Sequence, residues 1–265
     1  MLFRSGPTHR FPYAPERKYT PAQEAPSEAL AQLHAQLGVS RVVVVQATCH
    51  GHDNRAMLDA LAQRGDLARG VAVVPTDIGV DALQALHAAG VRGLRFVMLP
   101  RLVDAPHWPA LQALAAKVAP LGWHIELYLE PQQIQPWWAE LMALPKPLVI
   151  DHMGRPDVQQ GVAAAAYAPV LALLAARPDA WIKVSCPERL SVIGPWALGD
   201  EATPYRDVLP FAQHLVQAHP SRVLWGTDWP HPNMHTHTPD DARLVDWVAQ
   251  VAPTDRKSTR LNSSH

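Results

Sequence analysis

The chain has few of the features that stabilise a protein without a large hydrophobic core. Its 265 residues include only two cysteines, Cys49 and Cys186, with no CxxC spacing, which excludes a disulfide scaffold or a zinc-ribbon framework. Charged residues make up 18%, below the roughly 25% that is usual. The 23 Lys and Arg residues balance 24 Asp and Glu residues, which excludes a broad basic face for nucleic acid and a polybasic membrane anchor. The composition therefore predicts extensive buried apolar surface.

Long hydrophobic runs are also missing. The most apolar stretch, residues 161–176, is shorter than a bilayer span and contains Tyr167 and Pro169, so it predicts no membrane helix. The amino-terminal residues lack a basic region followed by an apolar stretch, which gives no indication of secretion. We expect the protein to work in the reducing cytoplasm.

The two ends of the chain differ from the rest. Residues 255–265 lose the apolar periodicity and resemble translated sequencing-adapter sequence, as do residues 1–5. We interpret both as non-native ends, with a natural polar tail as the alternative. No composition shift or flexible linker divides residues 6–254, which are predicted to form a single domain.

Short apolar runs alternate with longer segments that have apolar residues at helical spacing. The runs read as strands buried on both faces, and they are residues 42–46, 71–74, 91–95, 124–128, 148–151, 181–184 and 223–226. Their starts lie about 20 to 42 residues apart, which is the length of a strand, a crossover helix and a loop. This rhythm predicts an α/β fold with a parallel sheet.

A closed parallel barrel needs eight strands, and the apolar runs supply seven. We predict a (β/α)8 TIM barrel whose first strand is missing before Gly6, which would leave a sheet edge exposed beside the gap. A doubly wound open sheet is the alternative. No GxGxxG follows any of the predicted strands, so the dinucleotide-binding form of that fold lacks its phosphate loop.

Polar residues follow the predicted strands, where a barrel places its active site. In order along the chain they are Thr48, Cys49, His50, Asp53, Asn54, Arg95, Arg101, Tyr128, Glu130, Asp151, His152, Ser185, Arg189, Asp228, His231 and Asn233. Each has a structural explanation: Arg95 could pair with Asp77, and Asp228 could cap a helix. Their shared position at one rim favours a functional site, between strands that are themselves apolar.

Six motifs occur in order: FPYAPERKYTP (11–21), VQATCHGHDN (45–54), GVRGLRF (90–96), DHMGRPD (151–157), KVSCPERLS (183–191) and GTDWPHPN (226–233). Together they resemble the amidohydrolase superfamily, over roughly residues 6–253. DHMGRPD and GTDWPHPN are typical of its lactonase-like branch. The resemblance implies a TIM barrel that hydrolyses a planar, unsaturated six-membered lactone bearing two carboxylates, in the catabolism of lignin-derived aromatic compounds.

The resemblance also implies roles for individual residues. Asp228 would act as general base, and His152 would lie beside the lactone carbonyl. The substrate's carboxylates and carbonyl oxygen would be held by Arg95, Arg101, Tyr128 and Arg189, with further contacts from Thr48, Asn233 and Tyr19. These roles suit the chemistry, because Arg binds carboxylates with a planar fork, an oxyanion needs aimed donors and an enol oxygen leaves readily.

The chain departs from the superfamily pattern in its metal ligands. An HxH pair normally ends the first strand, and none is present here; Arg95 and Tyr128 stand where binuclear relatives have a bridging Lys and a His. We therefore predict no metal and no cofactor. A mononuclear zinc in a longer parent protein, held by the missing pair with His152 and Asp228, stays open.

Three alternatives remain at this point. A related enzyme of the same fold would hydrolyse 4-sulfomuconolactone with zinc, or isomerise D-galactarolactone. A truncated barrel without catalytic activity would bind anions through its Arg residues. A nicotinamide-dependent dehydrogenase is disfavoured by the absent glycine fingerprint. The predicted partner is a small anionic lactone, without nucleic acid or membrane.

Overall fold

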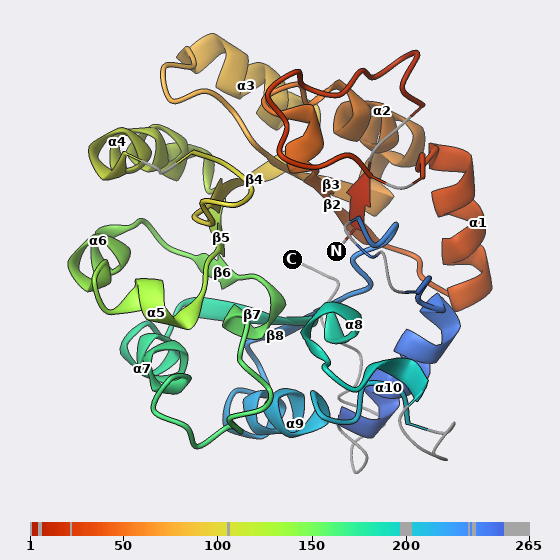
Figure 1. Cartoon of the computed structure of the whole chain (residues 1–265). Helices are drawn as coiled ribbons and strands as arrows, with labels where there is room; N and C mark the ends of the chain where they lie inside the picture. Colours follow the sequence, from red (N-terminus) through yellow and green to blue (C-terminus); the bar gives the residue numbers. More distant parts are fainter. Residues whose placement is uncertain are drawn as a thin grey trace.

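The computed structural model describes residues 2–4, 7–21, 23–104, 107–196, 203–232, 234 and 237–251. Its centre is one parallel sheet whose strands follow each other in chain order and curl around a common axis, with helices outside (Figure 1). The strands are β1 (Leu2–Arg4), β2 (Val42–Gln46), β3 (Ala68–Ala72), β4 (Val91–Val97), β5 (His124–Tyr128), β6 (Leu148–Ile150), β7 (Ala180–Ser185) and β8 (Val223–Gly226). This is the predicted TIM-barrel fold.

One part of the prediction is wrong: the first strand is present. Leu2–Arg4 pairs in parallel with Val44–Gln46 of β2, so β1 covers the edge of β2. A strand needs only backbone donors and acceptors to join a ladder, which explains how residues without family motifs fill this place. Among the described residues, ladders join each strand to the next and none joins β1 to β8. The non-native origin of residues 1–5 stays a prediction, and residues 252–265 lie outside the described part.

Ten α-helices and five short 3-10 helices connect the described strands. The α-helices are α1 (Ser27–Leu37), α2 (Arg55–Arg64), α3 (Val80–Ala88), α4 (Trp108–Val118), α5 (Pro131–Ile134), α6 (Trp138–Ala143), α7 (Ala168–Ala176), α8 (Pro187–Leu190), α9 (Leu209–Ala218) and α10 (Asp241–Val251). The 3-10 helices are η1 (Thr48–His50), η2 (Gly65–Leu67), η3 (Ala119–Leu121), η4 (His152–Gly154) and η5 (Gly194–Trp196). No helix among the described residues is long and apolar enough to cross a membrane.

The third strand lies further towards the amino terminus than its apolar run indicated. It spans Ala68–Ala72 instead of residues 71–74, because pairing with β2 begins at Ala68. Gly70 permits this register: a Cβ there would lie 2.9 Å from Leu61 Cδ1 of α2, so only glycine lets the helix pack this closely.

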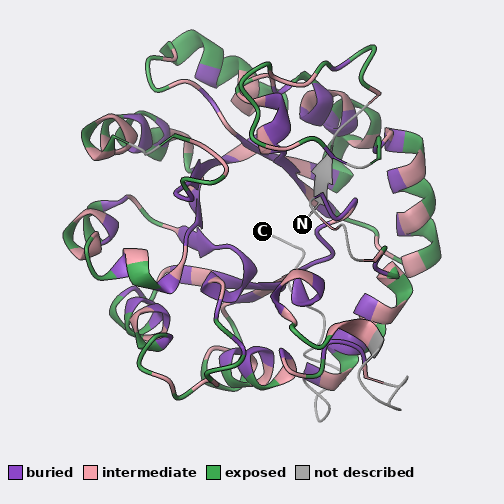
Figure 2. Cartoon of the chain, in the orientation of Figure 1, coloured by how far each residue is buried: buried purple, intermediate pink, exposed green. Residues whose placement is uncertain are grey.

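The hydrophobic core lies between the sheet and the surrounding helices. Figure 2 shows buried strands inside a ring of helices whose outer faces are exposed. Leu94 of β4 and Leu114 of α4 are each 1% exposed, and Trp123 and Trp247 are among the largest fully buried side chains. Burial of such side chains contributes about 1.5–3 kcal/mol each. The packed core therefore holds the sheet in a fixed position.

Candidate active site

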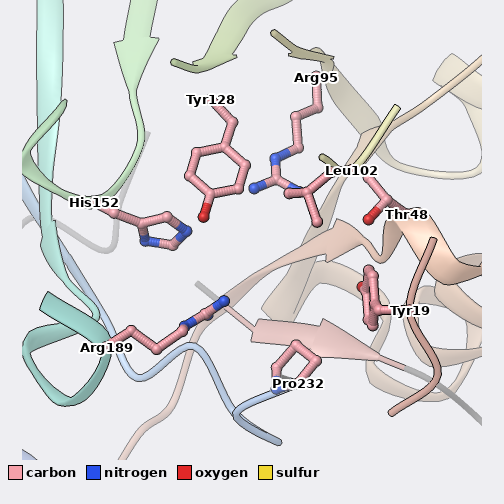
Figure 3. A pocket seen from close by; sticks show the side chains of 8 residues that line it. All are labelled: Tyr19, Thr48, Arg95, Leu102, Tyr128, His152, Arg189 and Pro232. Atoms are coloured by element: carbon pink, nitrogen blue, oxygen red, sulfur yellow. The ribbon is translucent and has the colours of Figure 1, made fainter. Parts of the chain in front are cut away.

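A pocket opens where the carboxyl ends of the strands meet. It is lined by Tyr19, Thr48, Arg95, Leu102, Tyr128, His152, Arg189 and Pro232 (Figure 3). Six of these were predicted from the sequence, all except Leu102 and Pro232. Figure 3 shows the Arg95 and Arg189 guanidinium groups, the Tyr128 hydroxyl and the His152 ring directed towards the same space. These six residues, which are distant in sequence, line one pocket.

Five of the lining side chains each come from a different strand or the segment directly after it. Thr48 begins η1 after β2, Arg95 lies in β4, and Tyr128 ends β5. His152 begins η4 after β6, and Arg189 lies in α8 after β7. Parallel strands place all these ends on one face of the barrel.

The backbone turns sharply after the last three strands. His152, Cys186 and Asp228 follow β6, β7 and β8, and their φ angles are 49°, 60° and 63°. Residues other than glycine rarely adopt this left-handed conformation, which costs on the order of 1–3 kcal/mol and is concentrated at functional sites. The same three side chains bring a His Nε2 or Nδ1, a thiol and a carboxylate within 4.8 Å of one another.

Asp228 and His152 form the centre of the predicted chemistry. Both are fully buried, and His152 Nε2 lies 3.9 Å from Asp228 Oδ1, too far for a direct hydrogen bond. Burial holds the pKa of His152 well below its usual value; the Asp151 charge opposes this, and Arg189 and Arg95 add to it. The imidazole is therefore neutral, and its Nδ1 shares a hydrogen bond of 2.8 Å with Ser185 Oγ.

Arg189 connects Asp228 to the pocket wall. Its Nη2 contacts Asp228 Oδ2 and lies 3.1 Å from Cys186 Sγ. Asp228 itself is not among the lining residues, so the carboxylate lies behind the guanidinium. An anion that binds Arg189 therefore competes with Asp228 for the same donors.

Arg95 belongs to a network of four buried charged side chains. We call this network the strand cluster, and its members are Arg95, Glu126, Asp151 and Lys183. Arg95 donates to Asp151 Oδ2 from Nε at 2.9 Å and from Nη2 at 2.7 Å, and its Nε lies 3.3 Å from Glu126 Oε1. Lys183 Nζ lies 2.9 Å from Asp151 Oδ1 and also contacts Glu126. These contacts fix the orientation of the Arg95 fork.

The two carboxyl groups of the strand cluster respond differently to burial. Burial raises the pKa of Glu126 to about 7; the Asp151 charge adds to this, and Lys183 and Arg95 oppose it. Burial also acts on Asp151, but Lys183 and Arg95 outweigh it and hold its pKa below the usual value. Near neutral pH Glu126 is partly protonated, so the cluster carries a fraction of a positive charge, which favours an anionic ligand.

Sequence reasoning missed Arg155. Its Nη1 donates to Tyr128 Oη at 3.0 Å, and its Nε lies 3.4 Å from Glu130 Oε1. The guanidinium carbon of Arg155 lies 5.8 Å from the centre of the Tyr128 ring. The guanidinium carbon of Arg95 lies 4.9 Å from the centre of the same ring. Arg155 belongs to the DHMGRPD motif, so the motif itself was the signal that could have identified it.

One predicted binding residue, Arg101, is not among the residues that line the pocket. The Arg101 side chain is 49% exposed and pairs with Glu130 Oε1 at 2.6 Å; its neighbour Leu102 lines the pocket instead. Asn233 lies outside the described residues. Substrate contacts by either residue stay predictions.

Two groups of three buried residues offer possible metal ligands among the described residues: His152, Cys186 and Asp228, and Glu188, Asp228 and His231. In both groups other side chains of the protein already contact the potential ligand atoms. Arg189 already contacts Asp228 and Cys186 in the first group. In the second, both ring nitrogens of His231 already contact carboxylates, Nδ1 that of Glu188 and Nε2 that of Asp241.

Comparison with known proteins shows the family to which the chain is similar. The family model described as Amidohydrolase matches residues 4–259. A 2-pyrone-4,6-dicarboxylate hydrolase of Comamonas testosteroni is 51% identical over 256 residues, covering 97% of this chain and 84% of that protein. A 4-sulfomuconolactone hydrolase of Rhizobium radiobacter is 33% identical over 94% of this chain and 81% of its own length.

A solved structure shows the same arrangement of strands and helices. A probable 2-pyrone-4,6-dicarboxylic acid hydrolase of Acinetobacter baumannii, crystallised with citric acid, superposes with a TM-score of 0.82 at 25% identity. The match covers 98% of this chain and 95% of that one.

Proposed function

Because this chain belongs to the amidohydrolase family, we propose that it is a lactone hydrolase that opens the ring of 2-pyrone-4,6-dicarboxylate. The observation that carries the proposal is the convergence of Arg95, Arg189 and Tyr128 on a pocket beside His152 and Asp228. The 51% identity to a 2-pyrone-4,6-dicarboxylate hydrolase supports it. The substrate is a small anionic molecule, and the two free, buried cysteines suit a reducing cytoplasm.

Substrate binding depends on fixed positive donors. The two carboxylates of the lactone bind the guanidinium groups at the pocket wall, which present planar pairs of donors. Arg95 is held by Asp151, so its fork is oriented before the ligand arrives. When a substrate carboxylate binds Arg189, it displaces the Asp228 carboxylate from that guanidinium and leaves it to act on water.

In the hydrolysis step Asp228 accepts a proton from water while the water oxygen attacks the lactone carbonyl carbon. The neutral His152 imidazole and a neighbouring Arg donate to the developing oxyanion. The ring carbon–oxygen bond then breaks, and the leaving enol oxygen takes up the proton that Asp228 had accepted, which restores the carboxylate. The product is 4-carboxy-2-hydroxymuconate, the enol form of 4-oxalomesaconate.

The proposal is tested with the purified chain and 2-pyrone-4,6-dicarboxylate, by following the loss of the pyrone absorbance. We expect turnover, and a fall of about 10²–10⁴-fold in kcat for Asp228→Asn, the range for general-base catalysis. Asp157→Asn, the same change at an exposed residue, is the control and should keep full activity. No hydrolysis by the unaltered chain contradicts the function, whereas near-normal turnover by Asp228→Asn contradicts only the role of the base.

The absence of a metal from the reaction is part of the proposal. Activity after prolonged treatment with a chelator should equal that of the untreated enzyme. Activity that is lost and then restored by zinc contradicts this point and favours the zinc-dependent alternative.

A second candidate function is hydrolysis of 4-sulfomuconolactone, which is favoured by the relative at 33% identity. A sulfonate and a carboxylate would bind the same guanidinium groups, but this lactone has a five-membered ring. Comparison of kcat/KM for the two lactones distinguishes the candidates, and we expect the pyrone dicarboxylate to be preferred.

A further inference from the structure

His231 lies between three elements behind the pocket. Its Nδ1 lies 3.2 Å from Glu188 Oε1 of α8, and its Nε2 lies 3.3 Å from Asp241 Oδ1 at the start of α10. Its backbone N–H donates to the Asp228 carbonyl oxygen at 2.8 Å. We call Glu188, His231 and Asp241 the His231 cluster. It joins the segment after β8 to α10, the next helix along the chain, and to α8, which is distant in sequence.

The imidazole of His231 has a carboxylate at each nitrogen. Carboxylates only accept hydrogen bonds, so both contacts can form only when both nitrogens carry protons. Burial alone would lower the pKa of His231, but the hydrogen bonds to Asp241 and Glu188 outweigh it and raise the pKa to about 9. The Asp228 carboxylate faces the same side chain, and His237 also lies within electrostatic range. At neutral pH His231 is therefore an imidazolium held by two acids.

The His231 cluster lies close in sequence to both Arg189 and Asp228. Glu188 directly precedes Arg189, and the four-residue helix α8 carries both. Asp228 and His231 both adopt the left-handed conformation, with φ of 63° and 57°, on either side of a short loop. Glu188 contacts the imidazolium while Arg189 contacts Asp228. One cation thus anchors both the guanidinium-bearing turn and the carboxylate-bearing loop.

We propose that His231 is a positioning residue that aligns Asp228 with Arg189 by bridging Glu188 and Asp241. This inference rests on the proposed function of the pocket, in which Asp228 accepts the proton from water. Without the bridge, α8 and the loop after β8 lose their common partner, and the distance from Asp228 to the reacting water is no longer fixed. Displacement by about 1 Å can reduce a rate about 100-fold.

The first experiment measures kcat and KM of His231→Gln and His231→Asn in the full chain. The neutral amides cannot donate to both carboxylates in the imidazole geometry, and we expect kcat to fall about 10- to 100-fold per folded molecule. Asp246→Asn, an exposed change on α10, is the matched control and should match the unaltered chain. Unchanged kcat in both His231 variants overturns the proposal.

A double-mutant cycle separates positioning from a structural role. If His231 acts through Asp228, His231→Gln should not lower kcat further once Asp228→Asn is present. Effects of the two substitutions that multiply overturn the proposal, because they show that His231 acts independently of the base. Thermal melts of each variant give the folded fraction by which kcat is normalised.

A third measurement does not need activity. The imidazole of His231, followed by NMR, should stay protonated above pH 8 and titrate at lower pH in Asp241→Asn or Glu188→Gln. In the active enzyme the alkaline limb of kcat should move to lower pH in Asp241→Asn. If His231 titrates near 6.5 in the unaltered chain, the bridge is overturned even where the lactone is hydrolysed. If His231 stays protonated above pH 8 but the lactone is not hydrolysed, only the proposed function is contradicted.

Discussion

Two groups of buried charges lie beside the arginines of the pocket wall. The strand cluster contains Arg95, and the His231 cluster includes Glu188, the neighbour of Arg189. The two clusters differ in the elements that carry them. Arg95 and Glu126 are direct partners in the ladder between β4 and β5, and Lys183 lies in β7. The members of the His231 cluster come from a loop and two helices. Backbone ladders therefore fix the first cluster, whereas the second depends on its own ion pairs to stay together.

This difference has consequences for mechanism. In the strand cluster the side chains are placed by register, so Arg95 is oriented before substrate binds. Around His231 the ion pairs between side chains hold the backbone in position. The reason is that α8 has only four residues and the loop after β8 forms no strand pairing. We expect substitutions in the strand cluster to affect stability first and those around His231 to affect catalysis first.

The largest expected effect on stability is that of Lys183→Met. It removes a cation from two buried carboxyl groups, and breaking such a pair costs about 3–5 kcal/mol. Urea unfolding measures the loss. Lys117→Met, at an exposed residue, is the control and should change stability by less than about 0.5 kcal/mol. A loss from Lys183→Met as small as the control would show that the ladders do not hold the strand cluster rigidly.

The next effect is the pH dependence that the His231 cluster contributes. The pKa of His231 is raised from 6.5 to about 9, so its stabilisation is complete below pH 6.5 and is lost as pH rises through 9. The contribution is up to about 3 kcal/mol. Unfolding free energies of the unaltered chain and His231→Gln should differ most below pH 6.5 and converge above pH 9. A constant difference across this range contradicts the expectation.

An effect of similar size in a different pH window should come from the strand cluster. The folded pKa of Glu126, about 7, exceeds its unfolded value of 4.5, so Glu126 stabilises the fold at low pH and this stabilisation is lost between pH 4.5 and 7. This shift is as large as that of His231, so the contribution is again up to about 3 kcal/mol. Glu126→Gln should remove the slope in this window and leave that of His231 intact. If both slopes change together, the two clusters are coupled.

The smallest expected effect is that of Arg101→Ala, compared with Arg155→Ala. The half-exposed ion pair of Arg101 with Glu130 contributes at most about 1 kcal/mol. Because Arg155 donates to Tyr128 at the pocket wall, we expect its substitution to raise KM more than that of Arg101. The reverse order would support the substrate contact that the sequence predicts for Arg101.

Much of the barrel could be predicted before any coordinates, because buried parallel strands are short apolar runs between helical segments. Three strands, β2, β5 and β8, have the predicted bounds. β1 could not be predicted, since three residues give no periodicity, and β3 was placed late because Arg69 and Gly70 interrupt its apolar run. The strands were also expected to be apolar throughout, yet Arg95, Glu126 and Lys183 lie within them.

What the amino-acid order determined on its own was the rhythm of strands and helices and the position of polar residues after the strands, because both are local patterns. Family motifs also led from the sequence to Asp228, His152 and most of the pocket wall. Tertiary structure alone decided which polar side chains meet: Arg155 with Tyr128, Lys183 with Glu126 and Asp151, and His231 with Glu188. Such pairings join elements that are distant in the chain, and a linear pattern carries no information on which buried charge faces which.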